Sequence, residues 1–142
     1  MAAGVALGIY LLPILTAPAG PTDTEIAAAS SKALFSARFT RDLPGSDFLH
    51  WGEGEVSISM RRISFSGELA PGPDYRLYLT PELALDEQAF LAQKSRSAYI
   101  GEVKSFDNFI LNIPENVNAS NFKGVIVWCE TFSQFITAAE YR

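Results

Sequence analysis

The feature of this sequence that most constrains its fold is an alternation of apolar and polar residues that runs from Phe35 almost to the C-terminus. In the segment GEVSISM, for example, Val56, Ile58 and Met60 fall on one face, and a glutamate and two serines fall on the other. Side chains alternate with a period of two along a half-buried β-strand, whereas an amphipathic helix repeats every ~3.6 residues. The pattern therefore predicts a protein built mainly from β-strands.

Several short runs share this alternation and are separated by turns rich in Gly, Pro, Asn and Asp. We expect strands over residues 54–60, 63–66, 75–79, 99–103, 109–113, 125–129 and 132–137. Such spacing is typical of an all-β protein, and we predict a single β-sandwich of about seven to nine mostly antiparallel strands. Residues 85–97 contain helix formers and are expected to form a short helical insertion, with a long loop as the alternative.

The strand predicted over residues 125–129 is apolar on both faces. Its sequence, VIVWC, places Cys129 on one face and Trp128 on the other. A strand of this kind is buried on both sides. In a sandwich its outer face needs a cover, which either the 85–97 insertion or the N-terminal linker could provide.

The N-terminal part of the chain differs sharply from the rest, because no charged residue precedes Asp23 and residues 2–15 are an apolar run. A run this short fits the apolar region of a signal peptide, although counting on to Pro21 approaches the length of a membrane span. Either alternative places the protein outside the cytoplasm, in the periplasm or at the cell surface, anchored in the membrane or secreted. A buried core helix is the remaining alternative. The predicted organisation is a signal peptide or membrane anchor (1–20), a linker in which Thr24 could cap a short helix (21–34), and the β-sandwich (35–142).

Scarcity of Cys and His excludes several classes of site. The single Cys cannot form an intramolecular disulfide, a Cys₄ zinc site or an iron–sulfur cluster. One His and one Cys also fall short of the ligand sets of blue-copper and catalytic zinc centres, so we predict no metal site. The chain has 11 basic and 16 acidic residues, a balance poorly suited to phosphate neutralisation, so we predict no nucleic-acid partner.

Cys129 and His50 are the candidate site residues. An unpaired thiol in an oxidising compartment is a liability unless it is shielded or used, so Cys129 is either redox-active or an inert core residue. Redox-active thiols are usually partly exposed and lie near a positive charge, which lowers their pKa. Cys129 is instead followed by Glu130, whose negative charge has the opposite effect. With no second cysteine, any thiol exchange must be intermolecular.

His50 shares strand parity with Val56, which places it in the interior or at its rim. It is either a ligand or proton carrier near Cys129, with Met60 as a second soft group, or a hydrogen-bonded structural histidine. Haem would need only one or two such ligands, but the sequence does not identify a cofactor.

Glu53 and Glu55 raise a third alternative. Two residues apart on a strand, they share a face at about 7 Å, a separation found between the carboxylates of inverting glycosidases. Charged residues that alternate with apolar ones are equally typical of a solvent-exposed face.

Several short motifs occur in an order that matches one known family. They are the strand FSARF at Phe35–Phe39, the pattern H-x-x-x-G at His50–Gly54, Gly72-Pro-Asp74 followed by Tyr75–Leu79, the glycine-bearing strand at Ile100–Lys104, Phe109–Pro114, and VIVWCETFSQF at Val125–Phe135 with Ala138-Ala139 behind it. Together these motifs resemble the DM13 domain, often described as electron transfer DM13, over about residues 35–142.

The resemblance implies an all-β extracellular or periplasmic domain, often tethered to a membrane, in which a single cysteine is proposed to be redox-active. The match to the W-C motif identifies that cysteine as Cys129. We therefore expect an accessory domain for electron transfer or thiol redox exchange, with an unknown redox protein as partner, rather than a stand-alone enzyme. The alternative is a cell-surface binding or structural module with an inert cysteine. The aromatic residues expected around Cys129 are Phe106, Phe109, Trp128, Phe132 and Phe135.

Overall fold

The computed structural model describes residues 20–142, so the predicted signal peptide or anchor falls outside the described residues apart from Gly20. The described chain is all-β, as predicted, with eight strands in two four-stranded antiparallel sheets. Its elements are α2 (Asp23–Ser30), β1 (Phe35–Phe39), β2 (Gly52–Ile58), β3 (Arg62–Leu69), β4 (Tyr75–Thr80), α3 (Glu87–Leu91), η1 (Lys94–Arg96), β5 (Ala98–Glu102), β6 (Phe109–Asn112), η2 (Ala119–Asn121), β7 (Gly124–Cys129) and β8 (Gln134–Glu140).

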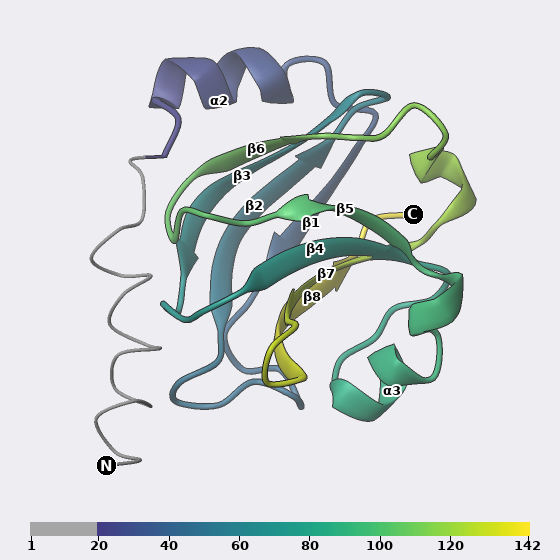
Figure 1. Cartoon of the computed structure of the whole chain (residues 1–142). Helices are drawn as coiled ribbons and strands as arrows, with labels where there is room; N and C mark the ends of the chain where they lie inside the picture. The colour runs from purple at the N-terminus through teal and green to yellow at the C-terminus, as the bar shows by residue number, and fades with distance from the viewer. Residues whose placement is uncertain (1–19) are drawn as a thin grey trace.

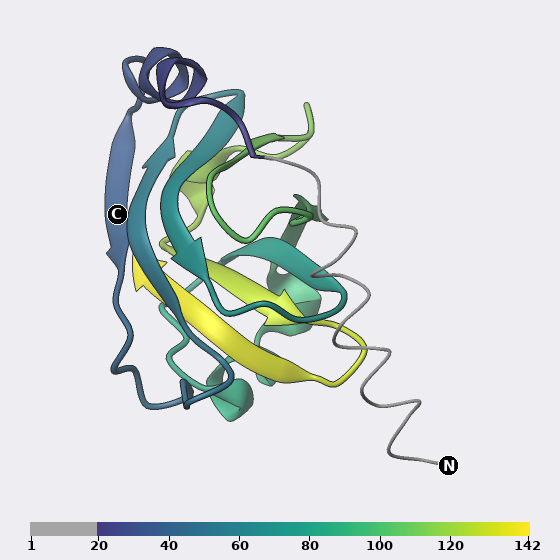
Figure 2. The same cartoon turned by 90° about the vertical axis from the view of Figure 1, so that its left-hand side faces the viewer.

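The two sheets form a sandwich, seen from two directions in Figures 1 and 2. One sheet has the strand order β1-β2-β3-β6 and the other β5-β4-β7-β8. Consecutive strands pair as hairpins in β2–β3 and β7–β8, whereas β6 and β7 each cross over to join a strand formed earlier in the chain. This arrangement places β4 and β7, the two most completely buried strands, in the middle of the second sheet.

The main core fills the space between the sheets. Inward-facing residues alternate along each strand, and their cross-strand partners include Val56 with Phe65 and Leu77 with Val127. Each of these four side chains is fully buried. The alternation seen in the sequence therefore arises from the pleat, which turns every second side chain inward.

A second apolar cluster lies on the outer face of β4 and β7, beneath α3. The Phe90 ring of α3 lies 4.6 Å from the Trp128 ring and 5.2 Å from the Tyr78 ring, measured between centroids. Asp86 begins α3 by accepting a hydrogen bond from the Ala89 amide at 2.8 Å. The prediction that residues 125–129 are buried on both faces is thus confirmed, and the 85–97 insertion supplies the cover.

Two local predictions are wrong. Met60 does not continue the inward face of β2, because the strand ends at Ile58 and Met60 lies in the following turn with 71% of its surface exposed. The N-terminal helix is capped by Thr22 rather than Thr24, since Thr22 and Glu25 form a reciprocal capping box. This helix, α2, packs against β3 and buries Ile26. Within residues 20–142, no helix has the length and apolar character that a membrane crossing requires.

Candidate functional site

Cys129 is the last residue of β7, and its side chain points into the core between the sheets. It pairs with Tyr75 of β4 on one side and with Gln134 of β8 on the other. Only 3% of its surface is exposed. β7 is flanked by a strand on each side. Because Cys129 is at the end of β7, its thiol lies next to the turns that join the strands.

The thiol lies between two turns. It donates a hydrogen bond to the Pro73 carbonyl at 3.1 Å, in the turn that precedes β4. On the other side, the backbone amides of Thr131 and Phe132, in the β7–β8 turn, hydrogen-bond to the sulfur. The two turns are joined directly, because Thr131 Oγ1 donates to Asp74 Oδ2 at 2.6 Å. The sulfur is therefore held by backbone groups from both sides.

Burial is the main influence on the thiol and raises its pKa above the usual value. The amides of Phe132 and Thr131 oppose this rise, because they stabilise the thiolate, whereas the negative charges of Asp74 and Glu130 add to it. At neutral pH, Cys129 is therefore a protonated thiol. Since the thiolate is the nucleophile, the resting site is weakly reactive.

A charged network lies beside this end of β7. Glu130 accepts hydrogen bonds from Lys94 Nζ at 2.9 and 3.0 Å and from the Tyr78 hydroxyl at 3.2 Å. Arg76 lies between the two acids, with its Nε 3.5 Å from Asp74 and its Nη1 3.8 Å from Glu130. The acids near the thiol are thus matched by two cations, one of which comes from the insertion.

The five predicted aromatic neighbours divide among three environments. Phe106 and Phe109 pack in the core that holds the thiol. Trp128 and Phe135 are buried on the opposite face of the sheet, under α3. Phe132 is exposed in the β7–β8 turn, where its contribution is its backbone amide. The first two pairs lie on opposite faces of the sheet that contains β7. Phe132 is outside the sheet, because β8 begins only at Gln134.

His50 lies in the loop between β1 and β2, at the rim of the sandwich. Its side chain is 14% exposed, and its Nδ1 lies 2.8 Å from Asp47 Oδ1. This hydrogen bond is the main reason that the pKa of Asp47 is lowered. No hydrogen bond joins His50 to Cys129 within the described residues, and the role of His50 as a ligand stays a prediction.

Other sequence candidates lie outside this site. Met60 lines a pocket beside α2, so it is not part of the core that contains Cys129. Glu53 pairs with Arg41 at 2.8 Å and Glu55 with Arg38 at 2.5 Å, and both carboxylates are on the solvent side of β2. The two glutamates therefore lie on a solvent-exposed face, where each forms an ion pair with an arginine. Residues 20–142 contain no group of three or more His, Cys, Asp or Glu that could hold a metal ion.

Two contributors to the thiol site escaped the sequence analysis. The Pro73 carbonyl and the amides of the β7–β8 turn are backbone groups, which have no residue-type signature. The Pro-Gly-Pro-Asp motif at Pro71–Asp74 did signal a turn, and Thr131 follows the W-C motif closely. Only the folded chain brings these two turns together.

Comparison with known proteins identifies one family. A family model described as electron transfer DM13 matches residues 23–141. No curated protein and no solved structure matches the chain. The family match confirms the resemblance seen in the sequence and also takes in α2, which precedes the first strand.

Proposed function

The chain belongs to the electron transfer DM13 family, and on this premise we propose that it is an exported redox domain in which Cys129 is the reactive group. The observation that carries this proposal is the position of the thiol between two turns. The amides of Thr131 and Phe132 favour the thiolate, and the turn that supplies them has exposed side chains. A small opening of that turn exposes the sulfur without disturbing the sheets.

The proposed reaction is thiol–disulfide exchange with a redox partner. As the turn opens, the Cys129 thiol loses its proton to solvent, and the thiolate attacks one sulfur of a disulfide on the partner. A bond forms between the two sulfurs, the partner's disulfide breaks, and its second sulfur leaves as a thiolate that takes up a proton. Because the chain has no second cysteine, an external thiol must resolve the mixed disulfide.

The test is the rate at which the native thiol reacts with an aromatic disulfide reagent as a function of pH. Below the pKa, the thiolate fraction rises about tenfold for each pH unit. We expect slow reaction at neutral pH, faster reaction as pH rises, and a rate well above that of global unfolding. The unfolded chain in urea gives the rate of the unprotected thiol, and Cys129→Ser gives the background.

Two matched variants test the proposed opening of the turn. Thr131→Val removes the hydroxyl that links the β7–β8 turn to Asp74, whereas Thr131→Ser keeps it. We expect the thiol to react faster in Thr131→Val and at the wild-type rate in Thr131→Ser. A Thr131→Val effect fully explained by lost global stability would contradict the proposed opening.

A second candidate function is a binding or structural module in which Cys129 is inert. The burial of the thiol and its raised pKa favour this candidate, because buried cysteines commonly act as small apolar residues. The same experiment separates the two. A thiol that reacts only at the rate of global unfolding, at every pH, supports the inert module and overturns the redox proposal.

We also propose that the domain works outside the cytoplasm and is either secreted or anchored by its N-terminal segment. The support is the apolar, charge-free run over residues 2–15 together with an unpaired cysteine that is kept buried. Burial protects a thiol from uncontrolled oxidation in such a compartment.

A further inference from the structure

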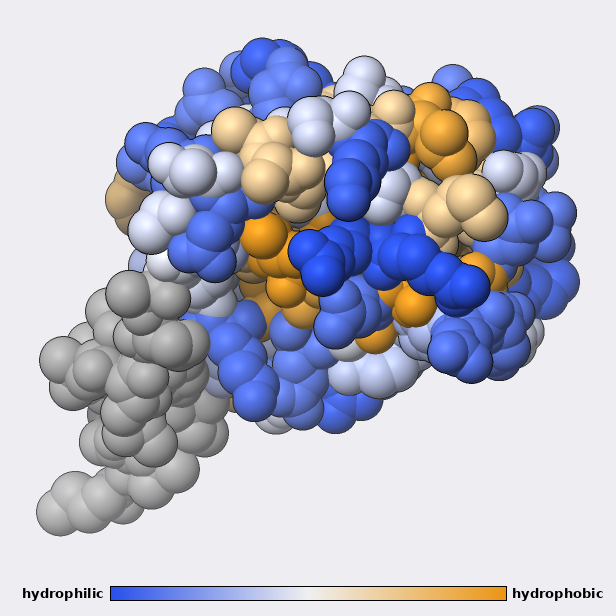
Figure 3. Space-filling model, turned by 90° about the horizontal axis from the view of Figure 1, so that it is seen from above, coloured by the Kyte–Doolittle hydropathy of each residue, from blue (hydrophilic) through white to orange (hydrophobic). Residues whose placement is uncertain are grey.

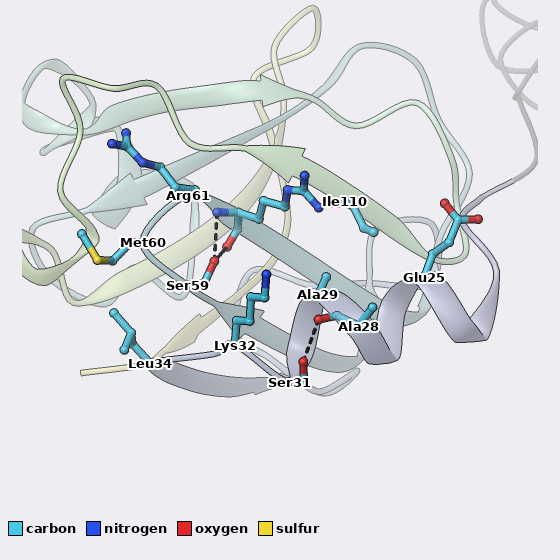
Figure 4. Close-up of a pocket in the computed structure, with 11 residues that line it drawn as sticks. Glu25, Ala28, Ala29, Ser31, Lys32, Leu34, Ser59, Met60, Arg61 and Ile110 are labelled. Carbon is cyan, nitrogen blue, oxygen red and sulfur yellow. Dashed lines mark hydrogen bonds between the residues drawn. The ribbon is translucent and has the colours of Figure 1, made fainter.

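A pocket of about 790 Å³ lies between α2 and the β2–β3 hairpin, away from the thiol site (Figure 4). One wall is the second half of α2 and the residues that follow it, and another is the hairpin turn with Met60 at its tip. Ile110 of β6 closes the pocket between them. The pocket is therefore built from three separate parts of the chain.

Three of the residues that line this pocket are cations: Lys32, Arg61 and Arg62. None of them has an ion pair within the described residues. Six other cations are paired with carboxylates: Arg38, Arg41, Arg76, Lys94, Lys104 and Lys123. Of the 11 Lys and Arg side chains in this chain of net charge −5, five have no ion pair within residues 20–142, and three of those five line this one pocket.

Negative groups near the pocket are already engaged. Glu25 lies at the far end of the pocket from the hairpin, and its carboxylate accepts hydrogen bonds from the Thr22 amide and hydroxyl at 3.2 and 3.1 Å. At the other end of α2, Ser30 and Ser31 donate their hydroxyls to the carbonyls of Ala27 and Ala28 at 3.2 and 2.8 Å. These bonds reduce the negative potential that a helix C-terminus would otherwise present.

Exposed apolar side chains flank the cations. Leu34 is 59% exposed and Met60 is 71% exposed, and both line the pocket. Figure 3 views the molecule from above Figure 1, the side on which α2 and β6 lie, and shows strongly hydrophilic and hydrophobic residues intermixed on this face. Cations beside exposed apolar residues are typical of surfaces that bind at the boundary between headgroups and acyl chains.

We propose that this pocket binds the phosphate headgroup of an anionic phospholipid at a bilayer surface. Lys32, Arg61 and Arg62 would contact the phosphate oxygens, and Leu34 and Met60 would lie at the acyl boundary. The charge of the pocket selects anionic lipid over zwitterionic lipid, because each added cation near such a surface strengthens binding. The inference does not depend on Cys129, and a hydrophobic N-terminal anchor would not distinguish the two kinds of lipid.

The first test places an environment-sensitive fluorophore on Met60→Cys, in full-length protein that also carries Cys129→Ser. The labelled protein is mixed with vesicles of phosphatidylcholine alone or of equal parts phosphatidylcholine and phosphatidylglycerol. We expect the fluorescence to shift to that of an apolar environment only with the anionic vesicles. The control label is on Gln88→Cys in α3, at the opposite end of the domain from α2 (Figure 1), and should not respond. The proposal would be overturned if the fluorescence of the label at position 60 did not shift with anionic vesicles, or if it shifted equally with neutral vesicles.

The second test compares two pairs of substitutions that change the net charge equally. Arg61→Gln with Arg62→Gln removes two pocket cations. Arg96→Gln with Arg142→Gln removes two cations that lie outside the pocket and have no ion pair within residues 20–142. At about fivefold per cation, the pocket pair should raise the anionic lipid concentration needed for a half-maximal shift by roughly 25-fold. Equal responses in the two pairs, or a full shift produced by soluble glycerol phosphate without vesicles, would show that no bilayer headgroup site exists here.

Discussion

At Tyr78, one hydroxyl joins the aromatic cluster under α3 to the charged network beside the thiol. The hydroxyl donates to Glu130, and burial followed by the charge of Glu130 raises the pKa of Tyr78 to about 12. A tyrosine in an unfolded chain ionises near pH ~10. The folded state therefore holds this proton more tightly than the unfolded state does.

This difference predicts how stability depends on alkaline pH. The stabilisation is complete below pH ~10 and is lost as pH rises through about 12, because the unfolded chain ionises first. We expect the free energy of unfolding, measured by urea denaturation at several pH values, to fall over this interval. The fall should be shallower in Tyr78→Phe, although Tyr141, whose pKa burial also raises, still contributes to it. Identical slopes in the two proteins would contradict the assignment to Tyr78.

Gly54 is required by the close approach of β2 and β3. Its φ is +144°, and a Cβ atom there would lie 2.3 Å from the Ser66 carbonyl oxygen. We expect Gly54→Ala to destabilise the protein by more than about 2 kcal/mol, since both the backbone angle and the contact are unfavourable. Gly101→Ala is the control, because its Cβ would meet only the Leu111 side chain at 3.6 Å. Chemical denaturation measures the free energy of unfolding of both variants. Similar losses of stability in Gly54→Ala and Gly101→Ala would contradict the requirement for glycine at the close approach of β2 and β3.

At the scale of elements, α3 acts as the cover of a sheet that would otherwise expose apolar residues. Phe90 is fully buried against Trp128 and Tyr78, whereas its neighbour Leu91 is exposed. Phe90→Ala should cost about 3–5 kcal/mol, because it removes a buried ring and leaves a cavity. Leu91→Ala should cost little on the same short helix. Thermal or urea unfolding of the two variants measures the contrast, and a small loss in Phe90→Ala would mean that the insertion is not a structural cover.

Elements differ in how well the sequence predicts them. β1 has the bounds that the family resemblance implied. The prediction for β7 misses one residue, because this strand has a clear apolar pattern bounded by turn residues. The errors fall at ends: Met60 follows the parity of β2 but lies beyond the last strand residue, and Phe132 lies in a turn. The alternation of side chains predicts which face of the sheet a residue occupies only as far as the strand extends. Where the strand ends depends on its partner, which the local sequence does not name.

At the scale of the whole molecule, the apolar, charge-free run over residues 2–15 predicts an exported protein. We expect the full chain to be found outside the cytoplasm, in the membrane fraction if the segment is retained. Leu12→Arg should abolish export, because a charge within the apolar run is costly to insert into a bilayer. Protease protection and alkaline extraction of membranes measure both outcomes. Leu91→Arg, at an exposed position of α3, is the control. A cytoplasmic wild-type chain would contradict the prediction.

The sequence by itself determined the all-β class, the position of most strands, the double burial of residues 125–129 and the membership of the family. These follow from local rules, because side-chain alternation and turn chemistry depend on neighbours along the chain. The tertiary structure alone decided what surrounds each group. It placed the Pro73 carbonyl and two turn amides on the sulfur of Cys129, separated the aromatic residues by face, and gathered Lys32, Arg61 and Arg62 at one pocket. Backbone groups and contacts between distant segments have no signature in residue type, so only the folded chain specifies them.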